Sequence, residues 1–172
     1  VDRSYLDFQQ KLLQYLSRSP EVIAPKVVLD SKGNAISSII DKYGNVRYIR
    51  LLIWIHGRLW SSVKPHTDSL RYSLGIKSGL LTKALQGFEH PLANRKLDWD
   101  NSQVEWVFNF LNLFHGKQKD LMLHFHTLIK SRISKLKKLR KSVIHNDLND
   151  NNIIVNSDLL NPEVVTTIDY GD

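Results

Sequence analysis

The 172-residue sequence contains no cysteine, which excludes disulfide bonds and every reaction that depends on a thiolate. It also lacks an apolar run of the ~18–20 residues that a membrane-spanning helix needs, so we expect no membrane partner. A hydrophobic content of 42% and a charged content of 24% are ordinary for a globular protein. The composition therefore predicts a globular domain of a soluble protein. The absence of thiols favours the reducing environment of the cytoplasm.

The net charge of +7 originates in one short segment. Between Lys130 and Lys141 there are seven lysine or arginine residues and no acidic residue. Leucine and isoleucine recur there at helical spacing, which predicts an amphipathic helix over 117–141 with one basic face. Such a face is usually solvated. The alternative, a nucleic-acid surface, is weakened because no aromatic residue lies among the basic ones.

Hydrophobic periodicity predicts helices at both ends of a strand-rich segment. The expected helices cover 3–17, 68–88, 103–114 and 117–141, and the expected strands cover 26–29, 35–40 and 46–55. Glycine-containing turns at 31–34 and 42–45 separate the strands. We expect Trp54 and Trp60 to pack in the core or between lobes. The order of elements indicates an α+β fold.

The motif with the most chemical content is His145-Asn-Asp147 followed by Asn152, the pattern H-x-D-x-x-x-x-N. An apolar run at 153–155 follows it, and a second apolar run ends in Asp169-Tyr-Gly. This order is typical of kinase-like phosphotransferases, whose catalysis depends on positioning and on electrostatic stabilisation of phosphate oxygens. The simpler interpretation is an Asn/Asp-rich turn that joins two short strands.

Each residue type in the motif suits one part of that chemistry. Asp147 would orient the acceptor hydroxyl and take its proton, and His145 would be a structural brace. Asn152 and Asp169 would supply the hard oxygen ligands that Mg²⁺ prefers. We therefore predict Asp147 as the catalytic residue and the other two, Asn152 and Asp169, as the metal ligands.

The chain resembles the aminoglycoside phosphotransferase family, and within it the hydroxylysine kinase branch with its bacterial relatives. The resemblance rests on three stretches: 50–58, 85–91 with 98–100, and 145–152 with 168–172. It implies a protein-kinase-like fold, in which a partial N-terminal antiparallel sheet lobe over 1–57 joins a helical C-terminal lobe over 58–172. The helical lobe would carry the catalytic hairpins.

The resemblance also implies the substrates. ATP or GTP would donate the γ-phosphoryl group, and its base would face the Ile53 carbonyl and the Ile55 amide in the linker between lobes. The acceptor would be the hydroxyl of an amino acid or amino alcohol, hydroxylysine-like. The acceptor's amine would bind acidic partners, for which Asp150 and Asp172 are the candidates.

Two features of a complete kinase fold have no counterpart here. A glycine-rich loop and a strand lysine should precede the first helix, but Lys26 follows it. Asp7 stands roughly where the helix acid would pair with that lysine. We therefore expect a phosphotransferase domain truncated at both ends, cut from a longer and even multidomain protein. The truncation favours a second hypothesis, a kinase-like module that binds nucleotide or a partner without turnover. Retention of all three motif residues argues against it.

Overall fold

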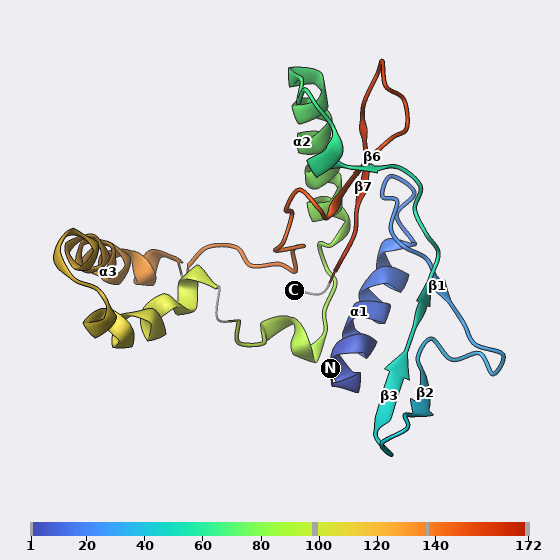
Figure 1. Ribbon diagram of the computed structural model, residues 1–172, viewed down its shortest axis with the longest axis horizontal. Helices are drawn as coiled ribbons and strands as arrows, with labels where there is room; N and C mark the ends of the chain where they lie inside the picture. Colours follow the sequence, from blue (N-terminus) through green and yellow to red (C-terminus); the bar gives the residue numbers. More distant parts are fainter. Residues whose placement is uncertain (1, 98–99, 137, 171–172) are drawn as a thin grey trace. The chain divides into compact units, whose positions relative to one another are not determined.

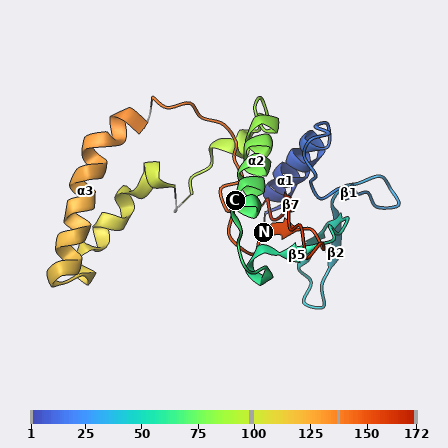
Figure 2. The ribbon, with the colours of Figure 1, turned by 90° about the horizontal axis from the view of Figure 1, so that it is seen from above.

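The structure, a computed structural model, describes residues 2–97, 100–136 and 138–170 (Figures 1 and 2). The chain divides into two compact units, of which the first joins Val1–Leu92 with Ser142–Asp172 and the second is Ala93–Lys141. The expected mixture of helices and short antiparallel strands is confirmed. The expected boundary between residues 57 and 58 falls inside the first unit, so the division into lobes stays a prediction.

Helix α1, Arg3–Leu16, agrees with the helix expected over 3–17. The Asp2 carboxylate caps it by accepting the Ser4 N–H at 2.7 Å, which satisfies a donor that the first helical turn leaves free. Its apolar stripe is buried and consists of Phe8, Leu12, Leu13 and Leu16. The Tyr15 hydroxyl donates to the Gln86 carbonyl at 2.9 Å, so α1 packs against the segment that follows α2.

Four short strands form antiparallel pairs after α1. Strand β1, Val27–Val28, pairs with β4, Leu51–Leu52, and β2, Ser37–Ile40, pairs with β3, Val46–Ile49. The strands expected at 26–29 and 35–40 are therefore present in shortened form.

The strand expected over 46–55 is divided. Only Arg50 separates β3 from β4, whereas residues 29–36 separate β1 from β2. The loop of residues 29–36 thus separates the pairing of β2 with β3 from the pairing of β1 with β4. The second pairing extends to Ile53, whose N–H donates to the Lys26 carbonyl at 2.8 Å.

A three-stranded sheet carries the C-terminal motif. Its order is β5 (Arg58–Leu59), β6 (Ile153–Val155) and β7 (Val164–Thr167), all antiparallel. The hairpin of β6 and β7, red in Figure 1, confirms the expected pair of apolar runs. Strand β5 was not expected, because two residues show no periodicity and their partner lies far along the chain.

The core of the first unit lies between this sheet and helix α2, Asp68–Ala84. Its buried cluster contains Trp60, Val63, Leu70, Ile153, Val155 and Val164. Burying side chains of this size contributes about 1.5–3 kcal/mol each. The H-x-D-x-x-x-x-N motif therefore ends at a strand that is buried along its whole length.

Two expectations about this region need correction. The helix expected over 68–88 ends at Ala84, because the chain leaves the helix at Leu85 and turns at Gly87, whose φ is 80°. Trp60 is only 6% exposed, as expected, but Trp54 is 76% exposed and does not belong to the core. It lies in the segment between β4 and β5, where no described element covers it.

The short 3₁₀ helix η2 (Pro91–Asn94) contains the boundary between Leu92 and Ala93. The second unit then consists mainly of the 3₁₀ helix η3 (Asn101–Leu113) and helix α3 (Gly116–Leu136), which are in contact. The segment expected as a helix over 103–114 is a 3₁₀ helix, broken at Phe110, whose φ and ψ of −104° and 16° are not helical. Aromatic residues and asparagine, which favour the α-helix weakly, are frequent there.

The basic helix expected over 117–141 is also shorter than predicted. Helix α3 ends at Leu136, and residues 138–141 form turn and coil. Repulsion among closely spaced lysines disfavours continuation of the helix. The expected single basic face is therefore wrong beyond Leu136. No helix within the described ranges is long and apolar enough to cross a membrane.

Candidate functional site

The loop between residues 145 and 152 begins with a left-handed turn. Asn146 has a φ of 67°, a conformation that asparagine tolerates better than most residues. The turn places His145 toward the interior and leaves Asp147 half-buried at the surface. One residue of unusual conformation thus separates a buried side chain from an accessible one.

His145 joins this loop to the segment after β7. Its side chain is 4% exposed, and its Nε2 lies 2.9 Å from the Ile168 carbonyl oxygen. The Asp147 backbone N–H points to Nδ1 at 3.4 Å, and the ring packs on Tyr170. Burial lowers the pKa of His145, which favours the neutral ring with its proton on Nε2. His145 is therefore the structural brace expected from the sequence.

The Asp147 carboxylate accepts hydrogen bonds from two side-chain amides. Asn149 Nδ2 lies 2.9 Å from each carboxylate oxygen, and Asn152 Nδ2 lies 3.0 Å from Oδ2. Asn152 Nδ2 also donates to the Asp147 carbonyl at 3.0 Å. No backbone N–H and no cationic side chain among the described residues donates to this carboxylate.

Asn152 is bound to the residue before Asp169. The Asn152 carbonyl accepts the Ile168 N–H at 2.8 Å, while His145 binds the Ile168 carbonyl. Ile168 is thus held from both sides by the loop of Asp147. Asp169 follows with a φ of 62° and an exposed side chain. The structure therefore brings three predicted residues, Asp147, Asn152 and Asp169, to one end of the β6–β7 hairpin.

Arg50 adds a positive charge near Asp169. Burial lowers the pKa of Arg50, and the negative charge of Asp169 acts in the opposite direction. Arg50, which lies between β3 and β4, is therefore close enough to Asp169 for the two charges to interact.

The donor set fits a hard divalent cation in part. Asn152 uses its Nδ2 on Asp147, so its Oδ1 is the atom that can bind a cation, and Asp169 offers an exposed carboxylate. The described residues contain no cluster of three or more His, Cys, Asp or Glu side chains that could hold a metal alone. Two protein oxygens plus substrate phosphates is the usual arrangement for Mg²⁺ in phosphoryl transfer.

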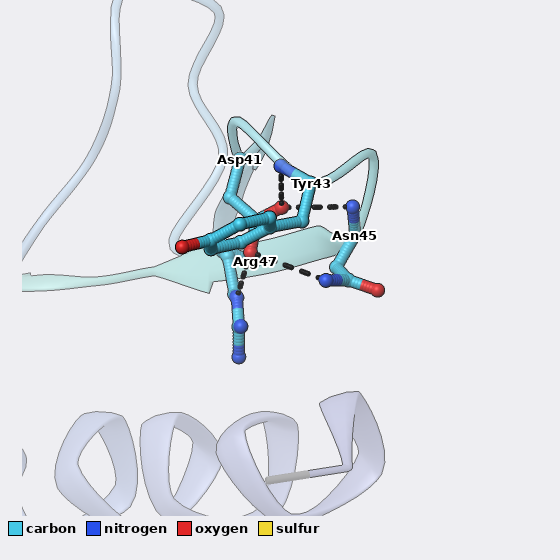
Figure 3. A network of polar contacts seen from close by, with 4 residues as sticks. All are labelled: Asp41, Tyr43, Asn45 and Arg47. Carbon is cyan, nitrogen blue, oxygen red and sulfur yellow. Dashed lines mark hydrogen bonds and ion pairs between the residues drawn. The ribbon is translucent and has the colours of Figure 1, made fainter.

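Three other aspartates show how a purely structural Asp/Asn turn is built. The Asp41 carboxylate accepts the N–H groups of Tyr43 and Asn45, each at 2.9 Å, and it pairs with Arg47 Nε at 2.8 Å (Figure 3). Asp30 accepts two backbone N–H groups in the same way, and so does Asp158.

These backbone hydrogen bonds are the largest cause that lowers the pKa of each of the three carboxyls. Asp147 lacks this arrangement, although its loop has the same composition. The simpler interpretation of the motif as a structural turn therefore does not describe Asp147.

The remaining predicted residues lie outside this cluster of contacts. The Asp150 side chain is exposed, and its carbonyl accepts the Ser61 N–H at 3.0 Å. Within the described ranges, neither the Ile53 carbonyl nor the Ile55 amide forms a hydrogen bond. Asp7 pairs with Lys11 at 2.6 Å on its own helix.

Asp172 was a predicted acceptor contact, and it lies outside the described residues.

Comparison with known proteins identifies the family. Residues 3–172 match the APH phosphotransferase enzyme family. The chain belongs to this family. The resemblance inferred from the motifs is thereby confirmed.

Two curated relatives match about three quarters of this phosphotransferase chain. Hydroxylysine kinase of Bos taurus is 28% identical over 138 residues, which are 74% of this chain and 36% of the relative. Hydroxylysine kinase of Mus musculus is 30% identical over 138 residues, with the same shares of 74% and 36%. The chain thus spans about a third of the length of these relatives.

A solved structure confirms the fold. The amicoumacin kinase hAmiN, in complex with AMP-PNP, Ca²⁺ and Ami, matches 99% of this chain and 49% of its own length. The TM-score is 0.66 at 18% identity. The expected kinase-like α+β fold is therefore correct for this member of the family.

Sequence reasoning missed three residues that hold the site of this phosphotransferase chain. Arg58 donates to the Asn156 carbonyl at 3.0 Å and to the Asp158 carbonyl, so it ties β5 to the β6–β7 turn. Ser73 of α2 accepts the Val164 N–H of β7 at 2.8 Å. The third is Asn149. Only Asn149 had a signal in the sequence, its place inside the motif, because the other two act across long stretches of chain.

Proposed function

We propose that this chain forms the phosphoryl-transfer centre of a small-molecule kinase. It would move the γ-phosphoryl group of ATP or GTP to a hydroxyl group. The observation that supports this most strongly is the hydrogen bonding of Asp147. Its carboxylate is oriented by two side-chain amides and, unlike the three turn aspartates, receives no backbone N–H from the described chain. A carboxylate held in this way keeps capacity to accept a proton.

In the proposed reaction the Asp147 carboxylate orients the acceptor hydroxyl. It takes the hydroxyl proton as the acceptor oxygen bonds to the γ-phosphorus and the bond to the leaving diphosphate breaks. Asn152 Oδ1 and the Asp169 carboxylate would hold Mg²⁺, which neutralises charge on the phosphates. The hydrogen bond from His145 to the Ile168 carbonyl would hold Asp169 beside the loop that carries Asn152.

The nucleotide base would bind the segment after β4. The Ile53 carbonyl and the Ile55 amide are an acceptor and a donor two residues apart, and no described residue uses either. The Ile53 N–H, by contrast, belongs to the ladder with Lys26. This division supports the expected role of the two groups toward a purine edge.

The acceptor would be an amino acid or amino alcohol, hydroxylysine-like. The names of the two curated relatives support this class. The exposed carboxylate of Asp150, three residues from Asp147, suits an acceptor amine. Asp172 keeps its proposed place as the second acidic partner. The absence of cysteine supports a cytoplasmic location.

Calorimetric titration with ATP and with GTP, each with and without Mg²⁺, tests the proposal. We expect binding that requires Mg²⁺ and that weakens at least tenfold in Asp169→Asn, since the variant removes one charged ligand. Asp158→Asn is the matched control, because Asp158 is committed to its own turn, and it should bind as the wild type does. Equal binding with and without Mg²⁺, or none, would contradict the proposal.

Turnover distinguishes the second candidate, a kinase-like module that binds nucleotide without catalysis. Phosphorylated 5-hydroxylysine, detected by mass spectrometry after incubation with the Mg²⁺ nucleotide, would support the kinase. Mg²⁺-dependent nucleotide binding with no product from a panel of hydroxylated amines would support the binding module. The retained Asp147 carboxylate favours the kinase.

A further inference from the structure

Asn149 contacts both Asp147, the proposed general base, and the backbone of its own turn. Its Nδ2 lies 2.9 Å from Oδ1 and 2.9 Å from Oδ2 of Asp147, and its Oδ1 accepts the Asn151 N–H at 2.8 Å. The backbone donor identifies the oxygen end of the amide, so the nitrogen end must face the carboxylate. Asn149 is therefore a bridge between the loop backbone and Asp147.

The two oxygens of Asp147 differ in how many donors they accept. Oδ2 accepts both Asn149 and Asn152, whereas Oδ1 accepts Asn149 alone among the described residues. A carboxylate oxygen accommodates about two donors. Oδ1 thus keeps room for one more donor, and Oδ2 does not.

We propose that Asn149 is a positioning residue for phosphoryl transfer, which fixes the Asp147 carboxylate so that Oδ1 receives the proton of the acceptor hydroxyl. The inference rests on the proposed function and adds a residue to it. In the step, the hydroxyl O–H bond breaks as the oxygen bonds to the γ-phosphorus. The proton goes to Oδ1, and the leaving nucleoside diphosphate takes the electron pair of the broken phosphoanhydride bond.

A merely structural Asn149 needs only its oxygen. Asparagine and aspartate both accept a backbone N–H two residues on, so either serves in such a turn. Asn149→Asp keeps that acceptor, removes the donor and places a second carboxylate against Asp147. Asn149→Ala removes both groups. The two variants therefore separate a positioning role from a role in the turn.

Steady-state kinetics with the Mg²⁺ nucleotide and 5-hydroxylysine test the catalytic consequence. Asn149→Asp should lower kcat by about 10- to 100-fold with the KM of the acceptor within threefold, since misorientation affects the transition state. Its melting temperature should stay near that of the wild type. Asn149→Ala should lose less kcat and more thermal stability. Asn151→Asp is the matched control: it adds the same charge at an exposed side chain for which the described residues show no hydrogen bond to Asp147, and it should leave kcat unchanged.

A second readout needs no turnover. The side-chain amide resonances of Asn149 in a ¹H–¹⁵N spectrum should shift when Asp147 is replaced by alanine. They should remain in place in Asp158→Asn. Unshifted resonances would overturn the inference, because the amide would not be bound to Asp147.

The kinetic outcomes separate the inference from the function on which it rests. Wild-type kcat in Asn149→Asp, together with loss of turnover in Asp147→Asn, would overturn the positioning role and keep the proposed function. Unchanged turnover in Asp147→Asn would overturn the proposed function itself. If the wild-type chain gives no product, the proposed function fails, and the amide resonances still decide whether Asn149 holds Asp147.

Discussion

The turn of the β2–β3 hairpin and the loop before β6 are both rich in aspartate and asparagine, but they use their carboxylates differently. In the first, Asp41 accepts two backbone N–H groups of its own turn and pairs with Arg47 (Figure 3). In the second, the donors that reach the Asp147 carboxylate from the described residues are side-chain amides. A carboxylate that accepts the N–H groups of its own turn stabilises the turn. We propose that a carboxylate held by side-chain amides, as at Asp147, remains available to a substrate.

The surroundings of the two hairpins differ in the same direction. The β2–β3 hairpin is exposed along most of both strands, whereas β6 is fully buried. A site that must hold its geometry to within a fraction of an ångström benefits from a rigid strand next to it. The difference shows that burial and hydrogen bonding distinguish the two loops, while composition does not.

The largest expected effect separates the two aspartates by function. Asp147→Asn should lower kcat about 10²- to 10⁴-fold, the usual contribution of a general base, with little change in melting temperature. Asp41→Asn should do the opposite, because it weakens the charged hydrogen bonds within its turn. Initial rates and thermal melts of both variants measure this. Comparable losses of kcat would break the comparison.

Glycine substitution should show how tightly the chain packs against β6 and how loosely it packs at the β2–β3 turn. At Gly57, whose φ is 153°, a Cβ would overlap the Val155 carbonyl oxygen and the Ile154 side chain of β6. Gly57→Ala should therefore cost about 3 kcal/mol of unfolding free energy. At Gly44, with a φ of 81°, the space is open, and alanine should cost about 1 kcal/mol from backbone strain. Urea titrations of both variants would reveal equal costs if the packing argument were wrong.

The brace from His145 should make stability depend on pH. Burial lowers its folded pKa below the ~6.5 of an unfolded histidine, so the unfolded chain binds the proton more readily. The contribution of His145 to the free energy of unfolding is therefore complete above about pH 6.5, and it is lost as the pH falls through the folded pKa.

Replacement of His145 tests this. His145→Gln should cost about 1–3 kcal/mol at pH 7.5, because it disturbs buried hydrogen bonds, and should flatten the loss of stability below pH 6.5. The exposed His56 provides the control variant His56→Gln, which should follow the wild-type curve. Unfolding free energies measured from pH 5 to 8 test this prediction. Parallel curves for wild type and His145→Gln would show that His145 does not cause the pH dependence.

The smallest effect concerns the attachment of β7 to α2. Ser73→Ala leaves the Val164 N–H without its acceptor, which should cost about 1 kcal/mol. Ser78→Ala is the matched change, because its hydroxyl donates to the Leu74 carbonyl of the same helix, and it should be nearly neutral. Chemical denaturation of the two variants compares them. Equal stability would mean that solvent replaces Ser73 at no cost.

Elements with strong local signals were predictable from the sequence. Helix α1, the β6–β7 hairpin and the start of α2 lie where hydrophobic periodicity places them. The family was also inferred correctly from the motif, through the spacing from His145 to Asn152 and the later Asp169.

The sequence was less informative where the local signal is weak or the partner is distant. Strand β5 exists only through its pairing with β6, and the second unit departs from the expected α-helices at Phe110 and Leu136. The exposure of Trp54 was also missed, since an aromatic residue between two strands resembles a core residue until the packing is known.

The sequence by itself determined the types and order of the chemical groups: an aspartate and an asparagine before one short apolar run, and a second aspartate after another. Only the tertiary structure decided which carboxylate stays available. Aspartates in Asp/Asn-rich turns look alike in the sequence, and the donors that reach them depend on how the chain folds around them. At Asp147 those donors are the amides of Asn149 and Asn152, held in place by a loop that His145 ties to Ile168.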